Sequence, residues 1–177
     1  MKMNSSLQRN LFLTLFLCLA FGITSYSQIR VKAQIGGSNF LGGSLDTEYD
    51  IALSESGKHT LTPTIGVGGL LPKWDQPTML IHLGLNYRYA GWGVGCEMSG
   101  FTLSPFSVPQ GNRDFPDIIV YPNINYTVFT KRNPSLFFSI SAGAYLAYSK
   151  NYYGVEPSFY YEGDPIPGLG ISVGYRF

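Results

Sequence analysis

The last ten residues of this 177-residue chain alternate between apolar side chains and small or polar ones. The apolar positions are Leu169, Ile171, Val173, Tyr175 and Phe177. Alternation with a period of two predicts a β-strand with one apolar face and one polar face. The apolar face of such a strand contributes little stability to a soluble domain when the strand ends in a terminal phenylalanine. It contributes more in the wall of a membrane barrel, where the apolar face meets lipid.

The N-terminal segment has the layout of a secretory signal peptide. Lys2 and Arg9 supply positive charge, an apolar core follows at residues 11–23, and small residues precede a cleavage position before Gln28. The apolar core is shorter than the ~20 residues that a transmembrane helix needs. We therefore expect residues 1–27 to be removed on export.

Residues 28–177 are expected to form one domain. The whole chain has 12 basic and 11 acidic residues, so no basic excess indicates nucleic-acid binding. Cys96 is the single cysteine after cleavage, which excludes an intramolecular disulfide and a cysteine zinc cluster. The sequence also shows no spacing typical of a metal site and no nucleotide motif, so we expect no metal and no cofactor.

Alternation recurs through the mature chain and predicts eight strands. These strands cover residues 29–35, 48–53, 60–71, 79–89, 92–99, 118–128, 136–146 and 168–177. Their lengths suit tilted membrane crossings of ~9–11 residues. The predicted fold is all-β: an eight-stranded antiparallel up-and-down transmembrane β-barrel.

Three segments fit this pattern less well. The second predicted strand is short and acidic, and Pro122 interrupts the sixth. Because proline cannot donate to a β-ladder, we interpret Pro122 as a bulge site. Residues 149–165 leave room for an extra hairpin, since residues 158–161 are strand-like.

The connections alternate between short and long. With the C-terminus taken as periplasmic, the short connections at 54–58, 90–91 and 130–134 lie on the periplasmic side. The external connections are residues 36–44, 72–77, 104–117 and 149–165. Short inner turns and longer outer loops are typical of outer-membrane barrels, and an even strand number places both termini in the periplasm.

Aromatic residues gather near both expected membrane interfaces, where rings anchor a barrel in depth. The expected inner girdle consists of Tyr87, Tyr89, Trp92 and Tyr175. The expected outer girdle consists of Trp74, Phe101, Phe106, Tyr148, Tyr152 and Tyr153.

The Ser-Tyr-Ser-Gln cleavage region and the ending Gly-Leu-Gly-Ile-Ser-Val-Gly-Tyr-Arg-Phe resemble those of small outer-membrane β-barrels of Gram-negative bacteria, especially the Bacteroidota. The ending looks like the C-terminal assembly signal of such barrels. The resemblance implies export, insertion by the barrel-assembly machinery, and residence among outer-membrane lipids. It implies no activity, because small barrels have many functions.

The polar faces of the predicted strands would point into the barrel. The expected lumen network contains Arg30, Lys32, Glu48, Asp50, His82, Arg88, Glu97 and Arg176, with Asn86, Asn123 and Asn125. Side chains largely fill the interior of an eight-stranded barrel. The favoured interpretation is a packed ionic plug, and a small pore or ligand pocket is the alternative.

His82, Glu97 and Ser99 are weak catalytic candidates, because a histidine exchanges protons near neutral pH. Some outer-membrane barrels deacylate lipid A, but the alternation turns these three residues inward, away from a lipid chain. The His-x-Ser pair of those enzymes is also absent, since Leu83 and Gly84 follow His82. We therefore expect no enzyme, with a lipid acyl hydrolase or transferase as the alternative.

The connection at 149–165 is rich in aromatic residues and acids, a combination that can bind a sugar, a cation or a protein. The aromatic residues are Tyr152, Tyr153, Phe159, Tyr160 and Tyr161. The alternative is a rim that only extends the girdle and packs on itself. Cys96 is expected on the lipid-facing side as a small apolar residue.

The leading functional hypothesis is an outer-membrane barrel with a structural or interaction role. It would act alone or as an accessory subunit of a larger outer-membrane complex, with other outer-membrane proteins as partners. The second hypothesis is the lipid-modifying enzyme. The third is a soluble exported barrel that binds a ligand, in which the apolar strand faces would point inward.

Overall fold

The computed structural model describes residues 28–70, 78–103, 116–151, 158–161 and 163–177, so the predicted signal peptide lies outside the described residues. The elements are β1 (Gln28–Gly36), the short 3-10 helix η1 (Gly37–Asn39), β2 (Gly42–Ala52), β3 (His59–Leu70), β4 (Thr78–Tyr89), β5 (Trp92–Leu103), β6 (Ile118–Phe129), β7 (Leu136–Asn151), β8 (Ser158–Tyr161) and β9 (Ile166–Arg176).

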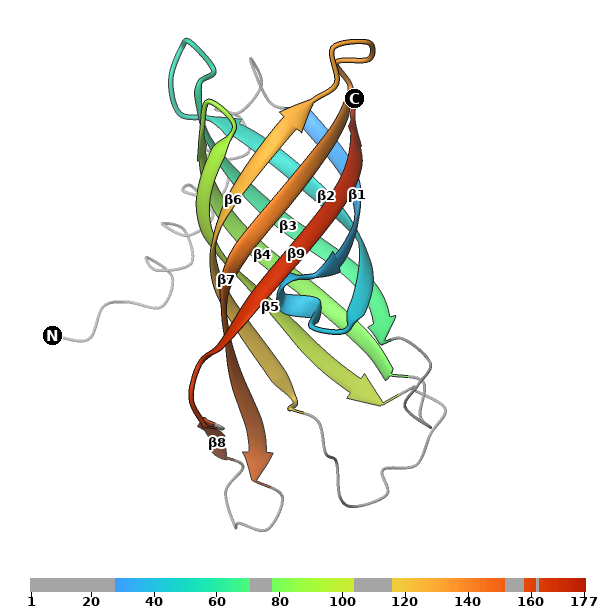
Figure 1. The fold of residues 1–177 in the computed structure, drawn as a ribbon, viewed down its shortest axis with the longest axis vertical. Helices are drawn as coiled ribbons and strands as arrows, with labels where there is room; N and C mark the ends of the chain where they lie inside the picture. Colours follow the sequence, from blue (N-terminus) through green and yellow to red (C-terminus); the bar gives the residue numbers. More distant parts are fainter. Residues whose placement is uncertain (1–27, 71–77, 104–115, 152–157, 162) are drawn as a thin grey trace, which may run out of the picture.

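Eight of these strands form a closed barrel (Figure 1). β1 to β7 pair antiparallel in chain order, β9 pairs with β7, and β9 returns to pair with β1. The predicted eight-stranded antiparallel barrel is confirmed. Among the described residues, no helix is long and apolar enough to cross a membrane.

The strand β8 is an extension of the wall rather than a ninth wall strand. It pairs with Tyr148–Asn151 at the far end of β7, on the same edge that β9 occupies further along. The extra hairpin, which the sequence allowed within residues 149–165, is therefore present. It projects beyond the barrel at the end opposite the C-terminus (Figure 1).

The second strand differs from its prediction. β2 begins at Gly42 and pairs with β1 from Gln28↔Asp50 to Ile35↔Gly43, so the predicted connection at 36–44 contains few unpaired residues. The alternation was hidden because the inward positions are acidic and Thr47 interrupts the outward apolar face.

Pro122 is not a bulge, and that prediction is wrong. β6 pairs with β7 at Val120↔Leu146 and at Asn123↔Gly143, so the register is the same on both sides of the proline. No residue is inserted. The missing proline N–H leaves only a local gap in the ladder.

Large apolar side chains cover the outside of the wall on every barrel strand. They include Ile35, Leu45, Ile65, Leu85, Val94, Ile124, Ile140 and Ile171, each at least half exposed. The positions between them point inward and are mostly polar. This inside-out distribution is the reverse of a soluble barrel, whose apolar residues fill the core.

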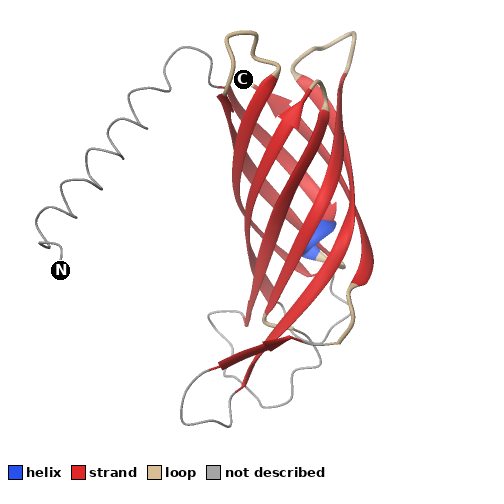
Figure 2. Ribbon diagram, turned by 90° about the vertical axis from the view of Figure 1, so that its left-hand side faces the viewer, coloured by secondary structure: helices blue, strands red, loops and turns tan. Residues whose placement is uncertain are grey.

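The connections β2–β3, β4–β5 and β6–β7 lie at the same end as the C-terminus (Figures 1 and 2). The tightest of them is Ala90-Gly91, with φ values of 49° and 92°. Positive φ at both central residues gives a turn whose twist matches that of the flanking strands. We call this end the terminal end and the other the distal end.

Candidate functional site

The lumen holds a cluster of ion pairs contributed by β1, β2 and β4. Arg30 pairs with Asp50, and the Lys32 Nζ lies 2.8 Å from Glu48 Oε1. The two terminal nitrogens of Arg88 donate to the two oxygens of Glu48, each at 3.0 Å. Glu48 is fully buried, and its carboxylate binds Lys32 and Arg88 at the same time.

A second cluster surrounds His82, which is also fully buried. Its Nδ1 lies 3.0 Å from Asp46 Oδ1, and its Nε2 lies 3.6 Å from Glu97 Oε2. Asp46 pairs with Gly66 in the ladder, and Gly66 pairs with His82. Because Gly66 has no side chain, the Asp46 carboxylate crosses β3 to reach the imidazole.

Polar side chains bridge these clusters to the rest of the wall. The Gln34 Nε2 donates to Glu97 at 2.9 Å, and Thr62 Oγ1 donates to Asp50 at 2.7 Å. On the other side, Asn125 Nδ2 donates to Asn86 at 2.8 Å. Hydrogen bonds to charged groups of this kind compensate the cost of burying them.

Aromatic rings and arginines lie at the terminal end of the lumen. The Arg30 guanidinium lies over the rings of Phe129 and Phe137, and that of Arg176 lies 4.5 Å from the Phe129 ring centre. Arg176 also donates to the Pro134 carbonyl at 3.1 Å. Arg176, predicted in the ionic network, therefore lies at the rim on aromatic and backbone partners.

The distal end is filled by η1, which folds back inside the barrel (Figures 1 and 2). Ser38 Oγ lies 2.9 Å from Ser99 Oγ, and Asn39 Nδ2 donates to Ser44 at 2.7 Å. Gly36 and Gly37 permit this inward turn, with φ values of 72° and 58°.

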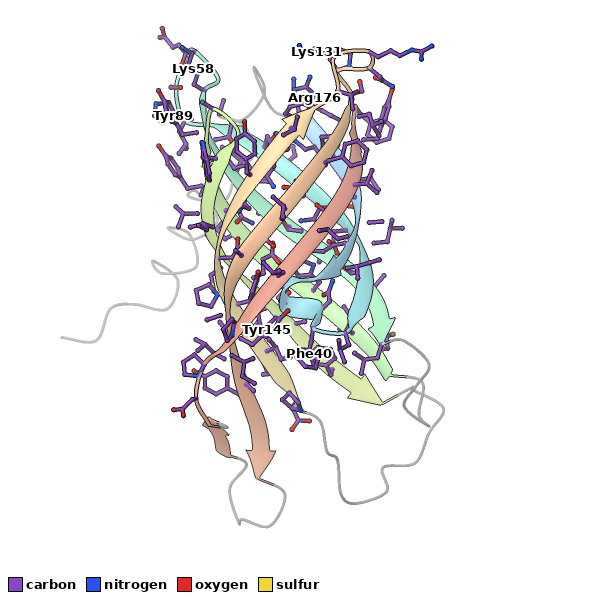
Figure 3. All side chains as sticks on the ribbon, viewed as in Figure 1. Phe40, Lys58, Tyr89, Lys131, Tyr145 and Arg176 are labelled. Atoms are coloured by element: carbon purple, nitrogen blue, oxygen red, sulfur yellow. The ribbon has the colours of Figure 1, made fainter. Side chains whose placement is uncertain are left out.

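Beyond η1 lies an apolar cluster inside the barrel. Phe40 packs edge-on against Tyr145, and Tyr145 stacks on Tyr121, with both centroid distances 5.3 Å (Figure 3). Phe101 belongs to this cluster with Leu80 and is 5% exposed. Its predicted place in the outer girdle is wrong, because it shares the inward face of β5 with Glu97 and Ser99.

The ion-paired side chains leave one small space between them that can be described. A cavity of about 10 Å³ lies between Lys32, Gln34, Arg88 and Glu97, room for roughly one water. The described part of the chain contains no cluster of three or more residues able to hold a metal ion. The close packing of these charged side chains fits the favoured interpretation of an ionic plug.

Of the three catalytic candidates, Ser99 is linked to His82 only through Asn39 and Ser44 within the described part of the chain, and not by a direct hydrogen bond. Glu97 and His82 approach each other, but the Ser99 hydroxyl donates to Asn39 Oδ1 at 2.9 Å. A nucleophile needs a base within hydrogen-bond reach, and a substrate needs access. All three side chains are buried.

Sequence reasoning missed Asp46, Gln34 and Ser44, which all point into the lumen. Their signal was present, since Gln34 continues the inward face of Arg30 and Lys32 along β1. Asp46 and Ser44 continue that of Glu48 and Asp50 along β2.

The outward residues and the loop residues can be placed in part. Cys96 is exposed on the outer face. At the terminal end, His59 lies 4.6 Å from Tyr89 and Trp92 lies 4.8 Å from Tyr126, measured between ring centroids. Several predicted residues have side chains outside the described part of the chain: Trp74, Phe106, Tyr152, Tyr153, Phe159, Tyr160 and Tyr161.

Comparison with known proteins adds little to this geometry. No family model and no curated protein matches the chain. Among solved structures, the N-terminal β-barrel domain of Pseudomonas aeruginosa OprF is similar, with a TM-score of 0.47 and 11% sequence identity. The match covers 85% of this chain and 96% of that domain.

Proposed function

We propose that the chain is an exported outer-membrane barrel with a structural or interaction role, of the kind found in Gram-negative Bacteroidota. It acts alone or as an accessory subunit of a larger outer-membrane complex, and both termini face the periplasm. The signal-peptide layout and the C-terminal motif support the proposed export and assembly by the barrel-assembly machinery.

One observation carries the proposal: the barrel is apolar outside and ion-paired inside. Apolar side chains such as Leu169, Ile65 and Leu45 are more than 60% exposed. A soluble protein rarely leaves so wide an apolar surface in contact with water. In lipid, the same surface is favourable. The soluble ligand-binding alternative requires the apolar faces to point inward, whereas they point outward.

The proposal includes no catalytic role. Its support is the burial of His82 and the separate hydrogen bond of Ser99, which leave no accessible nucleophile and base at this site. The connections that follow β3, β5 and β7 are then the proposed place for contact with a partner, since binding residues are found disproportionately in loops.

The proposal predicts where the native protein is found. After cell breakage, we expect it in the outer-membrane fraction, resistant to carbonate extraction. On a gel without boiling, it should migrate as a compact species that shifts on heating, because a closed barrel resists detergent until it is heated. A protein soluble without detergent, with no heat shift, would contradict the membrane location.

The same preparation tests the role. Purification in mild detergent followed by identification of co-purifying proteins should yield a stoichiometric outer-membrane partner if the chain is an accessory subunit, and the barrel alone if it is a stand-alone protein. Lipid A from a deletion strain should be unchanged in mass. An acyl change that His82→Ala reproduces would overturn the non-catalytic role.

A further inference from the structure

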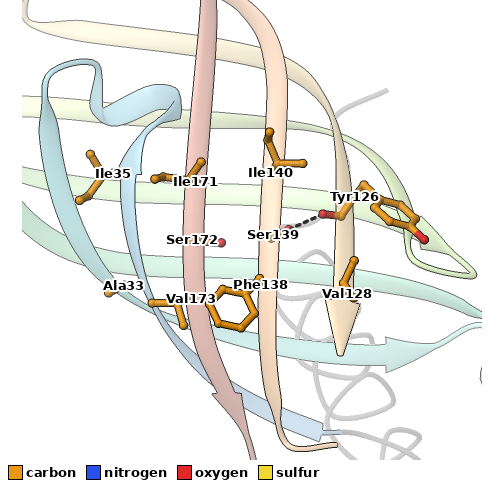
Figure 4. A pocket seen from close by; sticks show the side chains of 10 residues that line it. All are labelled: Ala33, Ile35, Tyr126, Val128, Phe138, Ser139, Ile140, Ile171, Ser172 and Val173. Carbon is orange, nitrogen blue, oxygen red and sulfur yellow. Dashed lines mark hydrogen bonds between the residues drawn. The ribbon is translucent and has the colours of Figure 1, made fainter. Parts of the chain in front are cut away.

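The outer wall carries a groove of about 520 Å³ across β6, β7, β9 and β1. Figure 4 shows two rows of outward side chains that border it. One row is Val128, Phe138, Val173 and Ala33, and the other is Tyr126, Ile140, Ile171 and Ile35.

The floor of the groove is the backbone between these rows. Ser139 and Ser172 lie at that level with their side chains on the lumen side, where Ser139 Oγ lies 2.8 Å from Thr127 Oγ1, so only backbone separates the rows on the outside. The Ser139 hydroxyl also donates to the Tyr126 carbonyl at 3.3 Å (Figure 4). The rows are two residues apart along each strand, about 6.6 Å. The apolar lining and the volume of the groove suit one extended hydrocarbon chain, and the short side chain of Ala33 leaves the β1 end of its row open.

A basic turn lies next to the β6 end of the groove. Lys131 and Arg132 follow Val128 by only three and four residues, about 10 Å of extended chain. Both side chains are exposed, and within the described residues neither has an ion-pair partner. Backbone hydrogen bonds hold the turn, including Thr130 N–H to the Leu136 carbonyl at 2.9 Å.

The apolar groove followed by the basic turn matches the apolar tail and the anionic head group of a phospholipid. An apolar trough alone would fit many occupants, but one that ends beside two unpaired cations fits a hydrocarbon chain attached to an anionic head group. Two other exposed charged residues at the terminal end, Lys58 and Glu55, lie on the β2–β3 turn and not beside the groove. Arg176, at the end of β9, donates to the Pro134 carbonyl.

We infer that this face binds one anionic phospholipid, with an acyl chain along the groove and the phosphate at Lys131 and Arg132. The inference rests on the proposed membrane location. It gives the outer wall a specific lipid site in addition to general contact with the bilayer.

Native mass spectrometry of the full protein, exported and purified in dodecyl maltoside, tests the site. Dioleoyl phosphatidylglycerol and dioleoyl phosphatidylcholine share their tails and differ in charge. We expect one retained phosphatidylglycerol, bound at least about tenfold more tightly than phosphatidylcholine. The double variant Lys131→Gln/Arg132→Gln should lose this preference, and Ala33→Trp, which fills the groove, should weaken both lipids.

Control variants introduce the same residue types, glutamine and tryptophan, at positions away from the groove and its turn. Lys58→Gln on another turn and Val94→Trp on the outer face of β5 should leave binding unchanged. Equal loss in Lys58→Gln, equal affinity for both lipids, or an Ala33→Trp variant that releases a protein partner but keeps the lipid would overturn the inference. A barrel that stays in the membrane fraction but binds no phosphatidylglycerol overturns the lipid site alone; recovery in the soluble fraction overturns the proposed function.

Discussion

Replacing Glu48 with glutamine is expected to destabilise the barrel by about 3–5 kcal/mol. Glu48 is fully buried and binds both Lys32 and Arg88. Glu48→Gln keeps the shape of the side chain but leaves two buried cations without their shared carboxylate. Removing one partner of a buried pair costs far more than an exposed pair contributes.

Urea unfolding in lipid vesicles, followed by tryptophan fluorescence, measures this cost. The control is Glu55→Gln, which makes the same change at an exposed turn position and should shift the unfolding free energy by less than about 0.5 kcal/mol. If Glu48→Gln costs no more than Glu55→Gln, the lumen is hydrated and the ionic plug is not a packed structure.

Gly68→Ala is expected to prevent correct pairing of β2 with β3. Gly68 pairs with Ser44, and a Cβ at this position would overlap the carbonyl oxygen of Gly43 and the Cα of Ser44. Both are backbone atoms, so a side-chain rotation cannot relieve the clash. We expect a loss of about 3 kcal/mol or more, at the upper end of overpacking effects.

The fraction of protein that migrates as the compact species on an unheated gel reports this defect after refolding into vesicles. Gly100→Ala is the matched control, because a Cβ there meets nothing within 4 Å. It should fold as the parent does. Equal folding of the two variants would show that β2 and β3 are not paired in this register.

The wall was largely predictable because alternation is a local signal. β4 and β9 show it most clearly, since apolar residues with small or polar neighbours occupy every second position. The start of β2 was predicted wrongly because this local signal is weak there: the inward face of β2 is acidic and its outward face includes Thr47. A strand whose two faces are both polar over part of its length loses its periodic signal.

The interior was predictable as a set of residues but not as a set of contacts. Asp46 reaches His82 only because Gly66 lies between them in the ladder, and this depends on the register of three strands. The inward turn of η1 was missed because Gly36 and Gly37 suggest an exposed turn equally well. Whether such a turn folds in or out depends on the space left by Tyr121 and Tyr145.

The central claim is that the apolar outer wall faces lipid, and Cys96 tests it without an introduced cysteine. Cys96 lies exposed on the outer face of β5 and pairs with Leu85 and Pro122 in the middle of the wall. A nitroxide attached to it in vesicles should collide often with oxygen and rarely with a water-soluble nickel complex. Nickel accessibility equal to that of a label at Glu55→Cys in a Cys96→Ser background would contradict the claim, because water would then cover this surface.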